Sequence, residues 1–102
     1  MEKERVEFLR RCMETVCPSG FEEEISHVWR KEADRFAERT WADSHGNSFA
    51  VVNEGGIPRV MLAGHADEIG LMITYIDDNG YLSFAGIGGW DPQVLPGQRV
   101  WV

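Results

Sequence analysis

The sequence is poor in basic residues and has no long uncharged hydrophobic run. Ten Lys and Arg side chains stand against 17 Asp and Glu, which gives a formal net charge of −7. A net negative surface repels phosphate groups, so the composition argues against nucleic acid and anionic membranes as partners. No stretch approaches the roughly 20 apolar residues that a membrane-spanning helix needs. We therefore expect a soluble protein with neither kind of partner.

The opening residues show no leader pattern, and cysteine is scarce. No apolar stretch follows the opening residues, so neither secretion nor organelle import is signalled, and a cytoplasmic location is expected. Cys12 and Cys17 are five positions apart, which fits neither a Cys-x-x-Cys redox pair nor a zinc knuckle. Both are predicted to be reduced and structural. The 102 residues have room for about one small domain.

Two helices are predicted in the first 40 residues, which hold eight of the ten basic side chains. Apolar residues recur at three- and four-residue spacing over 6–16, as one face of a helix requires, and Pro18 ends that helix. Ser19 and Glu22 form a capping-box pattern at the start of a second helix, which is predicted to run to about Phe36. The side chains it is expected to bury are Ile25, Val28, Trp29 and Phe36.

Strands and turns are predicted after the helices, where ten of the 11 glycines lie. The apolar pattern there shortens towards a period of two, which is typical of strands. The apolar run 60–63 is continuous, which indicates a strand covered on both faces. Residues 43–47 and 77–80 have the composition of turns. The predicted strands are 40–42, 48–52, 60–63, 69–76 and 81–85, so the fold class is α/β.

His65, Asp67 and Glu68 crowd immediately after the predicted strand 60–63. Ligands bind at the carboxyl ends of strands in open α/β sheets, so His65 is expected to project into a cleft. A metal-bound imidazole normally gives its second ring nitrogen to a carboxylate, and Asp67 is placed to accept that bond. A lone His-x-Asp pair is nevertheless common, and zinc needs three or four ligands. His27 and His45 are interpreted as a surface residue and a turn residue.

Five motifs occur in an order that resembles the N-terminal part of the tetrahedral, or TET, metallo-aminopeptidases, a family that includes glutamyl and deblocking aminopeptidases. The resemblance spans nearly the whole chain. The motifs are Pro-Ser-Gly-Phe-Glu-Glu-Glu at 18–24, Asp-Ser-His-Gly-Asn at 43–47, Gly-His-Ala-Asp-Glu-Ile-Gly-Leu-Met at 64–72, Ile-Gly-Gly-Trp at 87–90 and Gly-Gln-Arg-Val at 97–100.

The resemblance implies an α/β sandwich like that of the zinc aminopeptidases, in which two divalent metal ions, zinc or cobalt, serve to remove N-terminal residues from peptides. A small β-barrel or PDZ-like domain would be inserted into it and would drive assembly of dimers into a hollow dodecamer. Residues 1–72 would belong to the catalytic domain, and 73–102 would begin the inserted one. By the same resemblance, His65 is the first metal ligand and Asp67 the carboxylate that orients it.

The remaining ligands and the catalytic Glu come from later positions in the family, so we expect at most one partial metal site here. Residues 94–102 begin a strand and stop, which suggests a chain that is cut short and inactive alone.

A non-catalytic binding or assembly module derived from the same fold is the alternative. A glycosidase is a third, weaker possibility. It needs two carboxylates roughly 5–10 Å apart, whereas Asp67 and Glu68, on a strand, would face opposite ways, so this function is not favoured.

Overall fold

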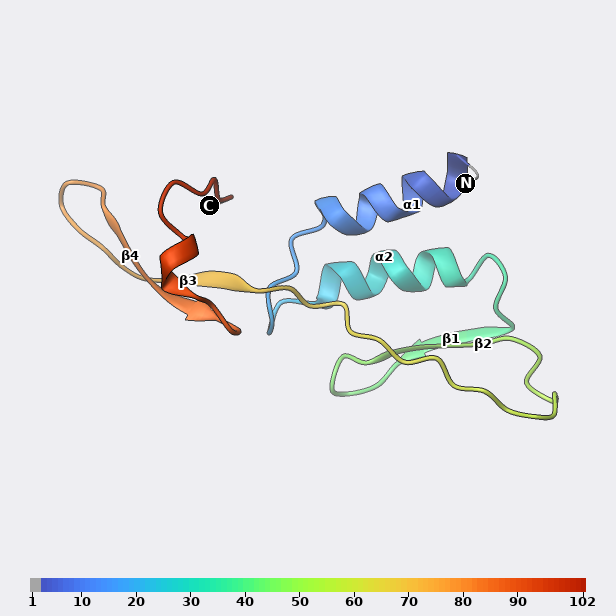
Figure 1. Ribbon diagram of the computed structural model, residues 1–102. Helices are drawn as coiled ribbons and strands as arrows, with labels where there is room; N and C mark the ends of the chain where they lie inside the picture. Colours follow the sequence, from blue (N-terminus) through green and yellow to red (C-terminus); the bar gives the residue numbers. More distant parts are fainter. Residues whose placement is uncertain (1–2) are drawn as a thin grey trace.

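The computed structural model describes residues 3–102, and its elements follow the predicted order of two helices and then strands (Figure 1). Two antiparallel sheets of two strands each pair β1 with β2 and β3 with β4. The α/β class is therefore confirmed at the level of mixed helices and small sheets. The elements are α1 (Lys3–Glu14), α2 (Glu23–Ala33), β1 (Arg39–Ala42), β2 (Ser48–Val51), β3 (Gly70–Ile76), β4 (Leu82–Ile87) and the 3-10 helix η1 (Pro92–Val94).

The two helices lie side by side, and α2 packs between α1 and the β1–β2 hairpin (Figure 1). Ion pairs join the helices: an Arg11 nitrogen lies 2.9 Å from a Glu32 carboxylate oxygen, and Arg35 lies 3.5 Å from Glu4. Exposed pairs of this kind contribute little to stability, so the small apolar core matters more. That core contains Cys17, Ile25 and Ala33, each exposed by 4 % or less.

The capping-box prediction for α2 is wrong. The N-cap is Glu22, whose side chain makes no capping hydrogen bond to the helix and instead accepts one from the Gly20 N–H at 2.7 Å. Ser19 lies outside the helix, and its hydroxyl donates to a carboxylate oxygen of Asp67. A long-range partner has thus replaced the local one that the sequence pattern offered.

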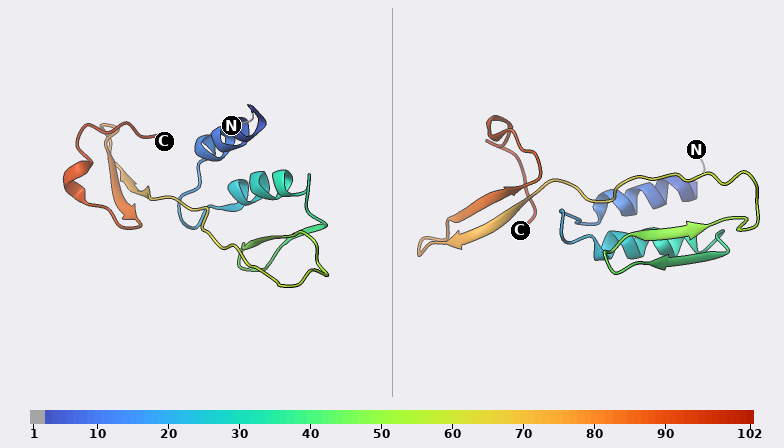
Figure 2. Two further views of the ribbon diagram at one scale, coloured as in Figure 1. Left: turned by 45° about the vertical axis from the view of Figure 1, so that its right-hand side comes forward. Right: turned by 90° about the horizontal axis from the view of Figure 1, so that it is seen from below.

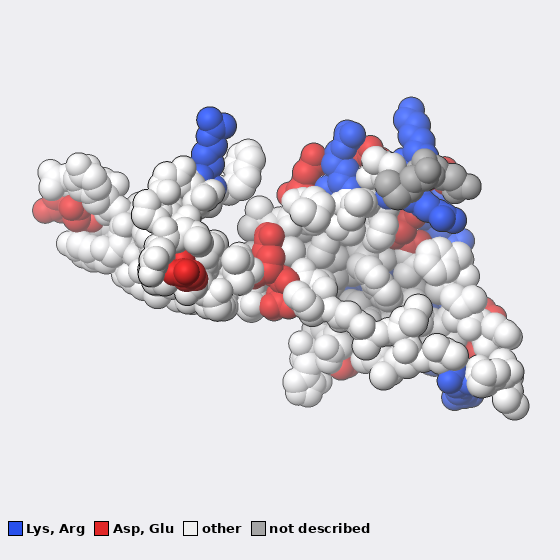
Figure 3. All heavy atoms as spheres, viewed as in Figure 1, with Lys and Arg blue, Asp and Glu red and all other residues white. Residues whose placement is uncertain are grey.

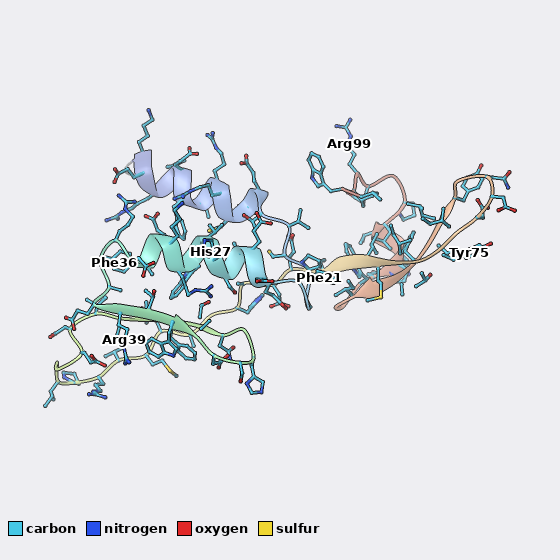
Figure 4. All side chains as sticks on the ribbon, turned by 180° about the vertical axis from the view of Figure 1, so that it is seen from behind. Phe21, His27, Phe36, Arg39, Tyr75 and Arg99 are labelled. Carbon is cyan, nitrogen blue, oxygen red and sulfur yellow. The ribbon has the colours of Figure 1, made fainter. Side chains whose placement is uncertain are left out.

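The predicted buried face of α2 is correct only in part. Ile25 is buried and Val28 is half-buried, but Trp29 remains 37 % and Phe36 66 % exposed. The helix ends at Ala33, so Phe36 lies in the turn that follows it and leaves the apolar stripe (Figure 4). The α1 stripe is similarly open, with Met13 77 % exposed, because within residues 3–102 α2 is the only helix or strand that packs against α1.

The β1–β2 hairpin forms as predicted. Trp41 pairs with Phe49 across the strands, and the two rings stack with centroids 4.9 Å apart. The turn is closed by Asp43, whose Oδ1 accepts backbone N–H bonds from His45 and Asn47, both at 2.9 Å. Carboxylates that accept hydrogen bonds from nearby backbone N–H groups in this way favour tight turns, which explains why the local sequence pattern was sufficient to predict this hairpin.

The predicted covered strand at 60–63 is wrong. Residues 59–67 have no strand conformation, and Val60, Met61 and Leu62 are 78, 85 and 94 % exposed. A strand needs at least one hydrogen-bonding neighbour, and a covered strand also needs elements packed on both of its faces. Within residues 3–102, β1 and β2 pair with each other and no other strand reaches this segment. The apolar run therefore lacks the ladder that would make it a strand.

The β3–β4 hairpin is confirmed and stands apart from the helices (Figure 2). Its turn repeats the chemistry of the first hairpin, since Asp77 accepts N–H bonds from Asn79 and Tyr81 at 2.9 and 2.8 Å. Beyond β4, the Trp90 indole N–H donates to the Gly70 carbonyl at 2.7 Å. Among the described elements, β3 and β4 pack against each other and not against α1, α2, β1 or β2.

Charge follows this division of the chain. In Figure 3 most Lys and Arg side chains project from the helical part, interspersed with acidic ones. After residue 40 the sequence has two basic residues, Arg59 and Arg99, against seven acidic ones. Across residues 3–102, no helix combines the length and apolar character required to cross a bilayer.

Candidate metal-ligand site

The candidate site is built where residues 17–19 lie alongside residues 66–68. A parallel bridge joins Pro18 to Glu68. In it the Glu68 N–H donates to the Cys17 carbonyl at 3.0 Å, and the Ser19 N–H donates to the Glu68 carbonyl at 3.2 Å. The Cys17 thiol adds a bond to the Ala66 carbonyl at 3.2 Å. These bonds hold the polar segment against the turn that precedes α2.

His65 and Asp67 lie together on this segment. The imidazole Nδ1 is 3.1 Å from Oδ1 of Asp67 and 3.0 Å from its backbone oxygen. The His65 side chain is 85 % exposed, whereas that of Asp67 is 36 % exposed. With a proton on Nδ1 the ring donates to the carboxylate, which leaves Nε2 as the nitrogen able to bind a ligand. The predicted contact between the two side chains is thus present.

Ser19 holds the other oxygen of the same carboxylate. Its hydroxyl donates to Oδ2 of Asp67 at 2.5 Å. This bond and, to a smaller extent, the one from His65 lower the pKa of Asp67 below its usual value, because each favours the charged form and together they outweigh the opposing effect of desolvation. Asp67 is therefore an ionised acceptor at neutral pH.

The donor set fits one ligand position and not a complete metal site. Residues 3–102 contain no cluster of three or more His, Cys, Asp or Glu side chains able to hold an ion. Zinc takes three or four protein ligands, and this segment offers one candidate, the Nε2 atom of His65. Asp67 is engaged with Ser19 and His65 and acts as the acceptor behind the imidazole. The role of His65 as a metal ligand stays a prediction.

The other singled-out residues lie elsewhere. His27 is exposed on α2 (Figure 4), and His45 is exposed in the β1–β2 turn, as predicted for both. Cys12 and Cys17 are both free, which agrees with the prediction that they are reduced. Burial raises the pKa of the Cys17 thiol, so it is a neutral hydrogen-bond donor at neutral pH.

Sequence reasoning missed two residues of the site, Ser19 and Cys17. Ser19 matched a helix-cap pattern, and Cys17 looked like one more core residue. Their partners, Asp67 and Ala66, are 48 and 49 positions away, so no local spacing signals the contacts. The only hint in the sequence was that two of the five ordered motifs contain the bridged residues.

A hollow of about 550 Å³ lies beside α2 and does not include His65 or Asp67. Phe21 and His27, labelled in Figure 4, are on its wall. The remaining lining residues are Val16, Pro18, Glu23, Glu24 and Arg30. The imidazole is therefore exposed and separate from this hollow, so the prediction that His65 projects into a cleft is wrong for residues 3–102.

Comparisons with known proteins agree on one family. The model of the M42 glutamyl aminopeptidase family matches residues 46–102. A putative aminopeptidase of Acetivibrio thermocellus is 38 % identical over 97 % of this chain and 30 % of its own length. The lysyl aminopeptidase of Pyrococcus furiosus is 35 % identical over 92 % of this chain and 27 % of its own.

A solved structure shows the same likeness in three dimensions. The crystal structure of a TET aminopeptidase from a marine sediment thaumarchaeon superposes with a TM-score of 0.86 at 34 % identity, over 94 % of this chain and 27 % of that one. The chain thus spans about 30 % of the length of the first curated relative. The family model covers more than half of the chain. These findings confirm the resemblance, and the chain belongs to the M42 glutamyl aminopeptidase family.

Proposed function

We propose that this chain supplies one metal ligand, His65, and its orienting carboxylate, Asp67, to an aminopeptidase that releases N-terminal residues from peptides. The observation that carries the proposal is the exposed imidazole whose Nδ1 faces Asp67, in a chain of the M42 family. Family membership implies divalent metal ions, and we propose two, zinc or cobalt. Their remaining ligands and the catalytic Glu would come from outside residues 3–102.

Each residue of this chain has a limited task in that reaction. The metal ions would lower the pKa of a bound water and polarise the scissile carbonyl. His65 would hold a metal through Nε2, and Asp67 would keep the ring in the tautomer that leaves Nε2 free. The lowered pKa of Asp67 keeps this acceptor charged at the pH where peptides are cleaved.

The same proposal covers domain organisation and assembly. Residues 1–72 would belong to the catalytic domain and 73–102 would begin an inserted β domain. The separation of β3 and β4 from the helices supports such a division, and the β3–β4 register shifts between Ile73 and Tyr75, close to the proposed boundary. A cytoplasmic homo-oligomer, built from dimers, would be the working form.

The test uses the protein at the full length that its gene encodes. Hydrolysis of aminoacyl p-nitroanilides with added zinc or cobalt is expected, and His65→Ala should reduce kcat/KM by at least about 100-fold, because it removes a ligand. His45→Ala, at an exposed turn position, is the matched control and should retain activity. Unchanged turnover in His65→Ala, or turnover in the wild type that a metal chelator does not reduce, would refute the proposal.

A non-catalytic assembly module is favoured by a different observation. The segment 57–62 exposes Ile57, Val60, Met61 and Leu62, each by more than three quarters of its surface. Exposed apolar clusters are typical of interaction sites. If this alternative holds, light scattering on the 102-residue chain will show a discrete oligomer, and the full-length protein will lack metal-dependent turnover. If the aminopeptidase proposal holds, the full-length protein will turn over substrate.

A further inference from the structure

We propose that Ser19 is a positioning residue whose hydroxyl fixes the Asp67 carboxylate, so that Asp67 holds His65 with its proton on Nδ1 and with Nε2 free. The chain of contacts runs from Ser19 Oγ to Asp67 Oδ2 at 2.5 Å, and from Asp67 Oδ1 to His65 Nδ1 at 3.1 Å. The consequence for metal binding rests on the function proposed above. The effect on the imidazole does not.

The exposure of the three side chains shows why the third group is needed. The His65 side chain is 85 % exposed, and an exposed pair of this kind contributes little free energy, so the contact with Asp67 would not by itself hold either side chain in place. Asp67 is less exposed, and Ser19 is half-buried. A carboxylate held at both oxygens cannot rotate without breaking a charge-assisted bond. Ser19 therefore removes the rotational freedom that the exposed imidazole cannot remove.

The backbone fixes Ser19 itself. Its N–H donates to the Glu68 carbonyl, and the Glu68 N–H donates to the Cys17 carbonyl, so both ends of the side-chain contact lie on one parallel bridge. The buried Cys17 side chain adds the bond to Ala66. Orienting groups behind a metal ligand work when their own position is held by further contacts. The bridge supplies such contacts.

A helix-capping role does not account for Ser19. The N-cap of α2 is Glu22, three residues further on, and no side-chain bond caps the helix. The N–H of Phe21 donates to the Pro18 carbonyl, which turns the chain between Ser19 and the helix. The Ser19 hydroxyl donates to Asp67. Removing that hydroxyl should therefore act on the carboxylate and not on the start of α2.

The test reads the imidazole directly, by long-range 1H–15N NMR of the 102-residue chain. The wild type should show His65 with the Nδ1–H form in excess, and Ser19→Ala should shift it towards the Nε2–H form. Ser19→Thr, which keeps the hydroxyl, should restore the wild-type spectrum. Ser83→Ala, at an exposed serine of β4, is the matched control and should change nothing at His65.

Hydrogen exchange at the Glu68 amide reports whether the bridge survives in each variant. If the Glu68 amide is no longer protected in Ser19→Ala, the Ser19→Cys variant is used instead, because a cysteine side chain fills a similar space but is a much weaker hydrogen-bond donor. If Ser19→Ala or Ser19→Cys keeps the protected Glu68 amide yet leaves the His65 tautomer as in the wild type, the proposal is overturned.

A second readout concerns metal. In the full-length protein, Ser19→Ala should weaken the zinc affinity about tenfold, the lower end of what such outer partners contribute. Absence of peptidase turnover in the wild type would refute the proposed function alone, because the tautomer shift in the chain is measured without metal or substrate. An unchanged tautomer would refute the positioning role alone.

Discussion

The segment 57–67 and the β3–β4 hairpin that follows it have similar apolar character but different structures. The hairpin pairs its strands from Gly70 with Ile87 to Ile76 with Leu82, and Trp90 caps it through the Gly70 carbonyl. The segment has no strand, and Leu62 is 94 % exposed. Apolar composition is therefore common to both, and the presence of a hydrogen-bonding partner is what distinguishes them.

Sequence distance explains which of them found a partner. β4 follows β3 after a short turn closed by Asp77, so the entropic cost of bringing the strands together is small. The long-range hydrogen bonds of segment 57–67 lie at its end, where Ala66 and Asp67, together with the following Glu68, meet residues 17–19. The polar end of the segment is therefore anchored while its apolar part is exposed. Four mutational predictions test this contrast.

The largest effect is expected from Trp90→Ala, which removes the cap of the hairpin. The variant loses the indole bond to Gly70 and the ring that lies against Gly86. Because Trp90 is half-buried, the free energy of unfolding should fall by about 2–3 kcal/mol, less than for a fully buried Trp. Urea unfolding followed by far-UV circular dichroism measures it. Trp101→Ala, at a residue 94 % exposed, is the control and should change stability by less than about 0.5 kcal/mol.

Gly70→Ala should have the next largest effect. A Cβ at this position would lie 2.7 Å from the Pro18 Cβ, where the start of β3 meets the bridged turn. Forcing those atoms apart should cost about 1–2 kcal/mol. Gly89→Ala, which meets nothing within 4 Å, is the matched variant. Equal stability of the two variants in the same urea experiment would contradict the close approach of Pro18 to β3.

A pair of leucines compares the two regions directly. Leu82, in β4, is 38 % exposed, whereas Leu62 is 94 % exposed. Leu82→Ala should lower the free energy of unfolding by about 1 kcal/mol, and Leu62→Ala by less than about 0.5 kcal/mol, in proportion to the apolar area that each buries. A larger loss for Leu62→Ala in the 102-residue chain would show that segment 57–67 is packed after all.

The smallest effect concerns the turn chemistry that both hairpins have and the exposed segment lacks. The Asn47 side-chain bond, with backbone N–H bonds from Asn47 and His45, lowers the pKa of Asp43. A carboxyl group whose pKa is lower in the folded state than in the unfolded state stabilises the fold at pH values above its unfolded-state pKa. This stabilisation is lost as the pH falls through the folded-state pKa. Asn47→Ala should therefore raise the Asp43 pKa and start that loss at higher pH. Carboxyl 13C NMR titration measures the shift, with Asn79→Ala as a control that should leave Asp43 unchanged.

The sequence predicted well those features whose causes are local. Both hairpins and their Asp-containing turns follow from spacing and turn chemistry. The His65 and Asp67 contact also follows, because the two residues are two positions apart. The prediction for Phe36 failed because helical periodicity does not reveal where a helix ends, and α2 ends at Ala33.

The sequence by itself determined the order of elements, the two hairpins and the placement of an imidazole beside a carboxylate, because each depends on residues a few positions apart. The tertiary structure decided the rest. In the folded chain the Ser19 hydroxyl binds Asp67, 48 residues away, and does not cap the adjacent helix. Residues 60–63 have no neighbouring strand and form none themselves. The physical reason is the same in both cases: a hydrogen-bond donor, an acceptor or a strand edge can pair only with a group that the folded chain places within hydrogen-bonding distance.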